Sequence, residues 1–333
     1  MPDASLGLLL FIVALAIGFG VVNGFNDAAN AIAASVACRA LSPRNAIMLA
    51  ALCNLAGAVT GLAVARTIGK GILVPEAISY LTVIASLASV IIWGSIATRL
   101  GLPVSITHSF VSALAAAGVA VVGGEAVQWP VLQRVGTSVV AAPVLGFIGG
   151  FVVMVALLWV FRRSAPSRVR VIFSRLQWLT TAFLAYSHGK NDGQMPIGVI
   201  TMALVIYTGQ TSLWDNIPWW VILVSALSIS SGTAVGGWRV IRTLGMRITL
   251  LQPIHGFAAD FTAATVIEVA SLLGIPVSTT HCASSAIMGI GATRRLTAVR
   301  WGVAGNIVAA WILTFPICGG LGYLFAQLFK LIS

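Results

Sequence analysis

A short polar stretch inside a long apolar run constrains this chain more than any other feature. Residues 23–31 read Asn-Gly-Phe-Asn-Asp-Ala-Ala-Asn-Ala, so they bring a carboxylate, three amides and a glycine into that run. Hydrocarbon penalises each of these polar groups unless a partner or a cavity receives it. A second stretch of this kind, His-Gly-Lys-Asn-Asp-Gly-Gln at 188–194, lies in a later apolar run. Two Asn-Asp pairs in two apolar runs predict a polar site within a membrane.

The composition is that of a membrane protein. Among the 333 residues, 59% are hydrophobic and only 8% are charged, whereas soluble domains carry about 25% charged residues. Several apolar runs approach the ~20 residues that cross a bilayer as a helix. We therefore predict an all-α polytopic membrane protein in the plasma membrane, which is the inner membrane of a Gram-negative cell.

The positive charge and the cysteines have simple explanations in such a protein. A net charge of +11 suggests nucleic acid in a soluble protein, but here Lys and Arg lie in short loops, where they orient the chain in the bilayer. The four cysteines show no CxxC spacing, so we interpret them as packing residues. No HExxH or GxSxG motif is present. We expect no enzymatic activity, no cofactor and no nucleic-acid partner.

The chain consists of two similar halves. A second repeated motif, Gly-Leu-Pro-Val-Ser-Ile-Thr-His at 101–108, matches Gly-Ile-Pro-Val-Ser-Thr-Thr-His at 274–281. The Asn-Asp motifs are offset by 191 − 26 = 165 residues, and the Pro-Val-Ser motifs by 274 − 101 = 173. We therefore divide the chain into a first membrane repeat at 1–161, a basic cytoplasmic linker at 162–176 and a second membrane repeat at 177–333, each repeat with about five membrane segments.

The basic residues predict the orientation. With the linker in the cytoplasm and five crossings per half, the positive-inside rule holds for 14 of the 19 Lys and Arg residues. These are Arg39, Arg44, Arg99, Arg162, Arg163, Arg168, Arg170, Arg175, Arg239, Arg242, Arg247, Arg294, Arg295 and Arg300. An odd number of crossings inverts the second half and puts both termini outside the cell. Segments 78–98 and 102–122 either cross twice or form a re-entrant hairpin, with the same parity.

The two Asn-Asp pairs are candidates for ion coupling. We expect Asn26-Asp27 and Asn191-Asp192 to break their helices, because glycine precedes each pair closely and Asn, Asp and Gly favour turns. Carboxylate, amide and freed carbonyl oxygens suit Na⁺, with Asp27 and Asp192 as metal ligands, while a carboxylate can instead carry a proton. Ordinary turns between short helices are the alternative. Repetition inside apolar runs favours the coupling role.

The Pro-Val-Ser-x-Thr-His motifs are candidates for an anion site. Proline ends the preceding helix, and serine is a preferred N-cap for the next one. The free N–H groups of that helix and the nearby hydroxyls would point at one spot, as in anion sites at helix N-termini. Ordinary capping is the alternative for either motif alone. Because both halves carry the motif, we predict an anion site.

Two further acids, Asp260 and Glu268, lie within an apolar run of the second half. Intramembrane carboxylates are functional candidates by default. Eight residues separate the two, so they share a helix face only approximately. Two roles are open for these acids: they relay protons, or they form hydrogen bonds to neighbouring helices.

The sequence resembles the inorganic phosphate transporter (PiT) family over essentially its whole length. The resemblance rests on residues 24–31, on Gly-x-Asn-Asp-x-Gln at 189–194 and on residues 276–281. It implies secondary transport of phosphate coupled to Na⁺ or H⁺, inverted repeats and often a homodimer. By position it implies a cation region of Asn26, Asp27, Asn30, Asn191 and Asp192, and a substrate region of Ser105, Thr107, Gln194, Ser278, Thr279 and Thr280.

Two positions depart from the family pattern and bear on the substrate. Ile106 replaces the Thr expected between Ser105 and Thr107, which makes the two halves of the anion site unequal. Lys190 stands where a small residue is usual and would add positive charge near the anion. Because the family also contains sulfate carriers, both departures leave the transported anion open.

A phosphate symporter is our leading interpretation. Hydrogen phosphate can give a proton to a carboxylate, whereas sulfate at neutral pH has none to give. A sulfate or other oxyanion permease of the same fold is the alternative. An anion channel is less favoured, because two helix breaks in inverted halves suit alternating access better than a continuous pore.

Overall fold

The computed structural model describes residues 5–332, which form helices joined by short loops. The chain ends, Met1 and Ser333, and the nearby Asp3 lie outside this range. The first half holds α1 (Leu6–Ala37), α2 (Pro43–Ala58), α3 (Ala63–Arg66), η1 (Thr67–Gly71), η2 (Pro75–Ala77), α4 (Tyr80–Leu100), α5 (Ile106–Val122), η3 (Gly124–Ala126) and α6 (Trp129–Val160). The second half holds α7 (Pro166–Asp192), α8 (Gln194–Thr208), η4 (Thr211–Trp214), α9 (Trp219–Val235), α10 (Trp238–Arg242), η5 (Thr243–Arg247), α11 (Pro253–Leu272), α12 (Thr279–Arg294), η6 (Leu296–Ala298) and α13 (Trp301–Ile332).

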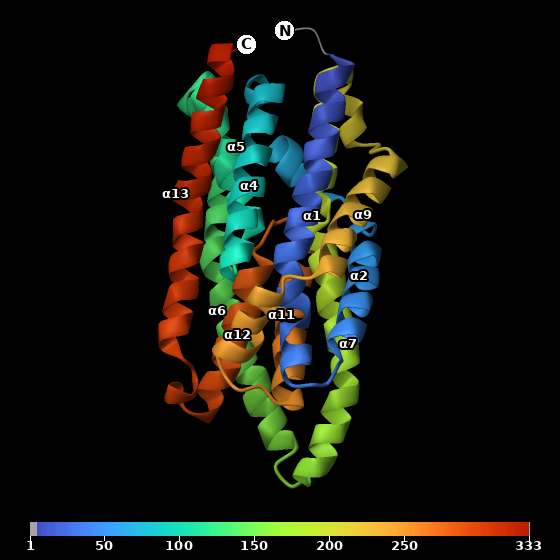
Figure 1. Ribbon diagram of the computed structural model, residues 1–333, viewed down its shortest axis with the longest axis vertical. Coiled ribbons are helices and arrows are strands. Elements are labelled where there is room, and N and C mark those ends of the chain that lie inside the picture. Colours follow the sequence, from blue (N-terminus) through green and yellow to red (C-terminus); the bar gives the residue numbers. More distant parts are fainter. Residues whose placement is uncertain (1–4, 333) are drawn as a thin grey trace.

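The second half repeats the order of elements of the first. A long helical segment with the Asn-Asp pair comes first (α1; α7 and α8), followed by a bent pair (α2 to η1; α9 to η5) that turns by 66° and 61°, respectively. A helical hairpin (α4 and α5; α11 and α12) and a final helix of 32 residues (α6; α13) complete each half. The two final helices run in opposite directions, since α6 descends and α13 ascends in Figure 1. Inverted halves predict this for every pair of equivalent elements.

The two hairpins enter the molecule from opposite ends and turn back near its middle. In Figure 1, α4 and α5 occupy the upper half and α11 and α12 the lower half. Their tips touch, because Thr280 Oγ1 donates to the carbonyl oxygen of Val104 (2.9 Å) and the rings of His108 and His281 are 4.9 Å apart. Each hairpin therefore spans only half of the fold. Segments 78–98 and 102–122 therefore form a helical hairpin whose tip lies near the middle of the molecule.

Two clusters of buried apolar side chains surround this meeting point. One includes Phe19, Ile106 and Phe110, and the other includes Ile32 and Phe173. Four helices, α1, α4, α6 and α13, are long and apolar enough to cross a membrane, and up to six spans result within residues 5–332 if each bent pair counts as one. The chain is therefore a multi-pass membrane protein in which polar groups lie between apolar layers.

The predicted helix break at the first Asn-Asp pair is wrong. α1 continues through Asn26-Asp27 without interruption, because side chains of other helices bond these polar groups and the backbone keeps its helical bonds. At the second pair, α7 ends and α8 begins at the single residue Gly193, directly after Asp192. The interruption is slight, because Gly193 keeps a helical backbone and its N–H still donates to the carbonyl oxygen of Gly189.

The glycines of the two motifs serve close packing. A Cβ atom at Gly24 would lie 2.0 Å from the carbonyl oxygen of Ile229 in α9, and one at Gly189 would lie 2.2 Å from that of Asn54 in α2. α1 therefore crosses α9, and α7 crosses α2, with their backbones almost in contact. Small residues at helix crossings in membranes allow this approach.

The expected basic linker is mostly helical. Because α7 begins at Pro166, only residues 161–165 connect it to α6. This turn lies at the same end of the molecule as loops 38–42, 248–252 and 295–300, while α1 begins and α13 ends at the opposite end (Figure 1). We call the end with these four loops the Arg-rich end, because ten arginines lie in or next to them: Arg39, Arg44, Arg162, Arg163, Arg168, Arg170, Arg247, Arg294, Arg295 and Arg300.

Candidate functional site

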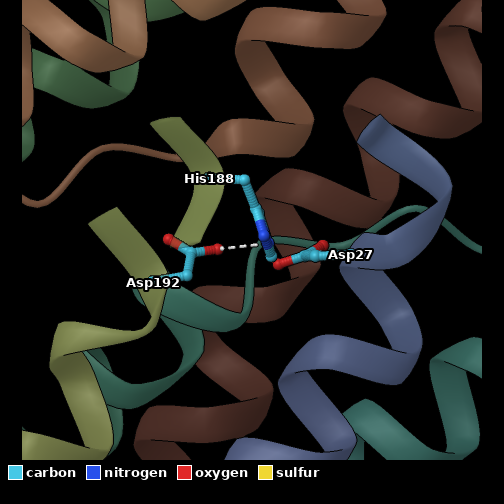
Figure 2. Close-up of side chains that lie close together, drawn as sticks. All are labelled: Asp27, His188 and Asp192. Atoms are coloured by element: carbon cyan, nitrogen blue, oxygen red, sulfur yellow. Dashed lines mark ion pairs between the residues drawn. The ribbon is translucent and has the colours of Figure 1, made fainter. Parts of the chain in front are cut away.

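The two aspartates of the repeated motifs meet in the interior. Asp27 from α1 and Asp192 from the end of α7 face each other across the ring of His188 (Figure 2). One ligand atom from each of the three residues lies within 4.8 Å of the others, and Nε2 of His188 is 3.2 Å from Oδ2 of Asp192. All three side chains are at most 1% exposed. Two buried carboxylates at this separation repel each other unless a proton or a cation compensates them.

Hydroxyls from the hairpin tips contact both carboxylates. Thr280 Oγ1 lies 3.0 Å from Asp27 Oδ1, and Thr107 Oγ1 lies 3.3 Å from Asp192 Oδ1. Thr279 donates to the other oxygen of Asp192 at 3.2 Å. Each hairpin therefore contacts the carboxylate of the opposite half, and the second hairpin contacts both.

The predicted serine caps are confirmed. Ser105 Oγ accepts from the N–H of His108, and Ser278 Oγ accepts from the N–H of His281, both at 3.1 Å. These bonds start α5 and α12, so two helix N-termini converge on the centre from opposite ends. Their positive ends favour negative charge there. Ile106, which replaces a threonine, is fully buried in an apolar cluster and adds nothing polar.

Asparagines of α1 extend the site along one helix face. The amide nitrogen of Asn30 lies 2.9 Å from Asp27 Oδ1 and 2.8 Å from Thr280 Oγ1, and that of Asn26 donates to Thr98 Oγ1 at 2.5 Å. The side-chain oxygens of Asn23, Asn26 and Asn30 are buried and accept no hydrogen bond from the described residues. Buried amide oxygens without a donor are suited to a cation.

In the second half, the site rests on hydrogen-bonded neighbours. Asn191, in the amide orientation that satisfies both its polar atoms, donates to Asp192 Oδ1 (3.0 Å) and accepts from Ser271 Oγ (3.1 Å). His188 Nδ1 bonds Asn54 Oδ1 at 2.8 Å, and Asn54 donates to Thr233 Oγ1 at 2.8 Å. The helices α2 and α9, each the first helix of its bent pair, therefore help to hold the imidazole in place.

Sequence reasoning missed His188 as a site residue. It lies four residues before Asp192, which places both on one face of a helix. This spacing was the available signal, but an expected helix break near residue 191 hid it. Asn54 gave no such signal, because only the crossing of α2 and α7 brings it to the imidazole.

Several predicted residues lie outside the carboxylate cluster. Gln194 accepts from the N–H of Ala65 (3.1 Å) and donates to the carbonyl oxygen of Lys190 (2.5 Å), so it joins α8 to the bent pair of the first half. Lys190 was expected to add positive charge near the anion. Its ammonium group instead pairs with Glu268.

The two acids of α11 are separate from each other. Glu268 accepts from Ser187 Oγ (3.3 Å) in addition to pairing with Lys190. Asp260 accepts from Thr181 Oγ1 at 2.9 Å and is 1% exposed. Both acids therefore bind α11 to α7 by hydrogen bonds, and no contact links either of them to the carboxylate cluster within the described residues.

The fold and the site together are those of a membrane transporter. Opposed hairpins with hydroxyl-lined helix N-termini and paired carboxylates between them are suited to binding and releasing ions. The chain belongs to the phosphate transporter family, whose family model matches residues 23–171 and 161–322.

Similar proteins agree with this assignment. A probable low-affinity inorganic phosphate transporter of Bacillus subtilis is 38% identical over 322 residues, 96% of both chains. One of Rhizobium meliloti, described in the same words, is 38% identical over 317 residues, 94% of this chain and 95% of its own length. A solved structure described as the sodium-dependent phosphate transporter superposes with a TM-score of 0.91 at 28% identity and covers 98% of this chain and 100% of its own.

Proposed function

We propose that this protein is a secondary active symporter that carries inorganic phosphate together with a cation by alternating access. One observation carries the proposal: a carboxylate from each half is buried beside the other and contacts the hairpin tip of the opposite half. Binding of a cation or proton offsets the repulsion between the carboxylates, and only then can an anion approach them. Anion binding and cation binding are thereby coupled.

Phosphate is the anion that this geometry favours. The hydroxyls of Thr107, Thr279 and Thr280 would turn from the carboxylates to the phosphate oxygens, and the N-termini of α5 and α12 would stabilise its charge. Hydrogen phosphate also carries a proton that a carboxylate can accept, which sulfate lacks. The relatives described as phosphate transporters support the same choice.

Sodium is the coupling ion that we propose. The buried, unpaired amide oxygens of Asn23, Asn26 and Asn30 and the carboxylate of Asp27 form a set of hard oxygen ligands on one face of α1. The structural neighbour described as sodium-dependent supports this assignment. Proton coupling is the second candidate, and the 3.2 Å contact between His188 and Asp192 favours it.

Orientation and assembly complete the proposal. We place the Arg-rich end in the cytoplasm by the positive-inside rule, so that the chain begins and ends outside the plasma membrane. A homodimer is proposed from the family resemblance.

Uptake into proteoliposomes tests the function. Labelled phosphate should accumulate when an inward Na⁺ gradient is imposed, and labelled sulfate should not. Accumulation driven equally by a pH gradient without Na⁺ would select proton coupling, whereas equilibration without accumulation under either gradient would contradict symport.

A further inference from the structure

A pocket lies at the Arg-rich end, away from the carboxylate cluster. It has a volume of about 770 Å³ and is enclosed by the α6–α7 turn, the first turns of α7 and α11, the last residue of α12 and the residue after α1. The side chains that matter for its chemistry are those of Cys38, Arg162, Ser167, Arg170, His255 and Arg294. Its size is that of a small-molecule site.

The charged side chains that line this pocket are all arginines. Neither Arg170 nor Arg294 forms an ion pair within residues 5–332, and Arg162 stacks on the ring of Trp159 at 5.0 Å. The sequence has no Asp or Glu between Glu125 and Asp192, so the turn and most of α7 carry only positive charge. Three arginines and no Asp or Glu line the pocket, and guanidinium groups in such surroundings are suited to an oxyanion, above all phosphate.

A buried histidine supplies a donor at the same place. His255 is 4% exposed, and its Nδ1 accepts from the N–H of Gln252 at 3.0 Å. The ring proton of the neutral imidazole therefore lies on Nε2, because Nδ1 is the acceptor in the ring's hydrogen bond to Gln252. Since His255 lines the pocket, this N–H is available to a ligand. The N-terminus of α7, which has no side-chain cap, lies beside it.

A buried row of residues connects the pocket with the carboxylate cluster. Cys38 lines the pocket and donates to Gln177 Oε1 at 2.8 Å. From Gln177, one face of α7 continues through Thr181 and His188 to Asp192, at intervals of four, seven and four residues. All four of these α7 side chains have 0% exposure. The pocket thus lies at the end of the polar face that leads inward to the proposed transport site.

We propose that this pocket is a second anion site, which holds phosphate at the Arg-rich end as it enters or leaves the carboxylate cluster. The inference rests on the proposed function. Its chemistry, two or three guanidinium groups and an imidazole N–H around a phosphate group, would also accept the head group of an anionic phospholipid. The experiment therefore has one arm for each source.

Protection of a cysteine in the pocket provides a readout that does not require transport. In a variant with Cys53, Cys282 and Cys318 replaced by alanine, the rate of Cys38 modification by a small thiol reagent is measured on purified protein. Inorganic phosphate is added, with chloride at equal ionic strength as the reference. The exposed Ser167, changed by Ser167→Cys, serves as a second reporter in case Cys38 reacts too slowly.

Matched arginine variants test the site itself. Arg170→Gln with Arg294→Gln removes two lining charges, and Arg163→Gln with Arg168→Gln removes two charges from the same end outside the pocket. Phosphate should slow modification in the parent and in the control pair. In the pocket pair, the phosphate concentration for half-protection should rise by roughly tenfold or more, because charge-assisted hydrogen bonds are lost.

The outcomes separate this proposal from the proposed function. Asp192→Asn should abolish phosphate accumulation but leave the protection of Cys38 by phosphate unchanged. A failure of transport alone therefore does not contradict the proposed pocket site. Protection by a short-chain phosphatidylglycerol but not by phosphate or phosphatidylcholine would support the phosphate-group site and assign it to lipid. Protection by chloride, equal loss in both arginine pairs, or no protection of either reporter by phosphate or lipid would overturn the proposal.

Discussion

Thr107 and Thr280 occupy equivalent positions in the two halves, and each contacts the carboxylate of the other half. Thr107 lies 3.3 Å from Asp192, and Thr280 lies 3.0 Å from Asp27. A hydroxyl has one proton, so Thr280 can donate either to Asp27 or to Val104 at any moment. A bound anion or a protonated carboxylate would therefore change the contacts between the hairpins directly.

The carboxylates are the first residues to test. Asp27→Asn and Asp192→Asn each keep the side-chain shape but remove the charge that compensates a coupling cation. Concentrative phosphate uptake in proteoliposomes should be abolished in both variants, while membrane insertion and elution as a monodisperse protein are retained. Near-normal accumulation in both would remove these residues from the coupling site, and loss in only one would show that the halves differ.

The unequal hairpin tips give a second prediction. Thr279→Val deletes a hydroxyl that contacts Asp192 and that we propose turns to the bound phosphate. A hydrogen bond to a charged group is worth roughly 1.5–3 kcal/mol, so the apparent phosphate affinity should fall about ten- to hundredfold. Concentration-dependent uptake measures it. Unchanged affinity would exclude position 279 as an anion ligand.

The equivalent position of the first hairpin should behave differently. Ile106 is fully buried, and a Cβ at Gly94 would lie 2.9 Å from its Cδ1. Ile106→Thr would place a hydroxyl in apolar surroundings, at a cost of about 1–3 kcal/mol without a partner. We expect a lower melting temperature in detergent and no gain in affinity. Improved affinity at unchanged stability would show that the new hydroxyl reaches the anion.

At the scale of elements, two close helix crossings position the site. α1 meets α9 at Gly24, and α7 meets α2 at Gly189, each with a backbone carbonyl of the partner against the glycine. The second crossing brings Asn54 to His188. A bent pair of each half is thereby attached to the Asn-Asp helix of the other half. Movement of one bent pair would therefore displace a carboxylate.

Substitution of a crossing glycine tests this role. Gly189→Ala would put a Cβ 2.2 Å from the carbonyl oxygen of Asn54, and the resulting overpacking should cost about 1–3 kcal/mol. Gly136→Ala in α6 is the matched control, because a Cβ there meets nothing within 4 Å. Thermal unfolding in detergent should separate the two, with reduced phosphate affinity only at Gly189. Equal melting temperatures would contradict the tight crossing.

At the scale of the whole molecule, the halves present their hairpins and final helices in opposite senses. α5 packs along α13 and α12 packs along α6, so each hairpin is held by the last helix of the other half. α6 runs from one end of the molecule to the other, from Trp129 to the turn at the Arg-rich end (Figure 1). The two ends should therefore face opposite sides of the membrane.

Accessibility from the two sides tests the orientation. In a background without the native cysteines, Ser167→Cys at the Arg-rich end should react with an impermeant reagent only from the cytoplasm, and Gln128→Cys only from outside. Intact cells and inverted vesicles provide the two measurements. Reaction of both positions from outside intact cells would overturn the topology and the argument from basic loops.

The sequence alone determined the membrane class, the serine caps and the residue types of the site. These follow from local rules, since an apolar run needs hydrocarbon, proline followed by serine starts a helix, and a buried carboxylate needs a partner. Asp27 and Asp192 were identified in this way and the three threonines by the family resemblance, and the structure brings all five together.

Only the tertiary structure decided which partners these groups have. The sequence predicted a break in α1 because it treats Asn, Asp and Gly as turn formers, whereas contacts from Asn30 and Thr280 satisfy Asp27 within an intact helix. Lys190 pairs with Glu268, and His188 joins the site through Asn54. Such pairings depend on how helices far apart in sequence cross, and local composition carries no information about that geometry.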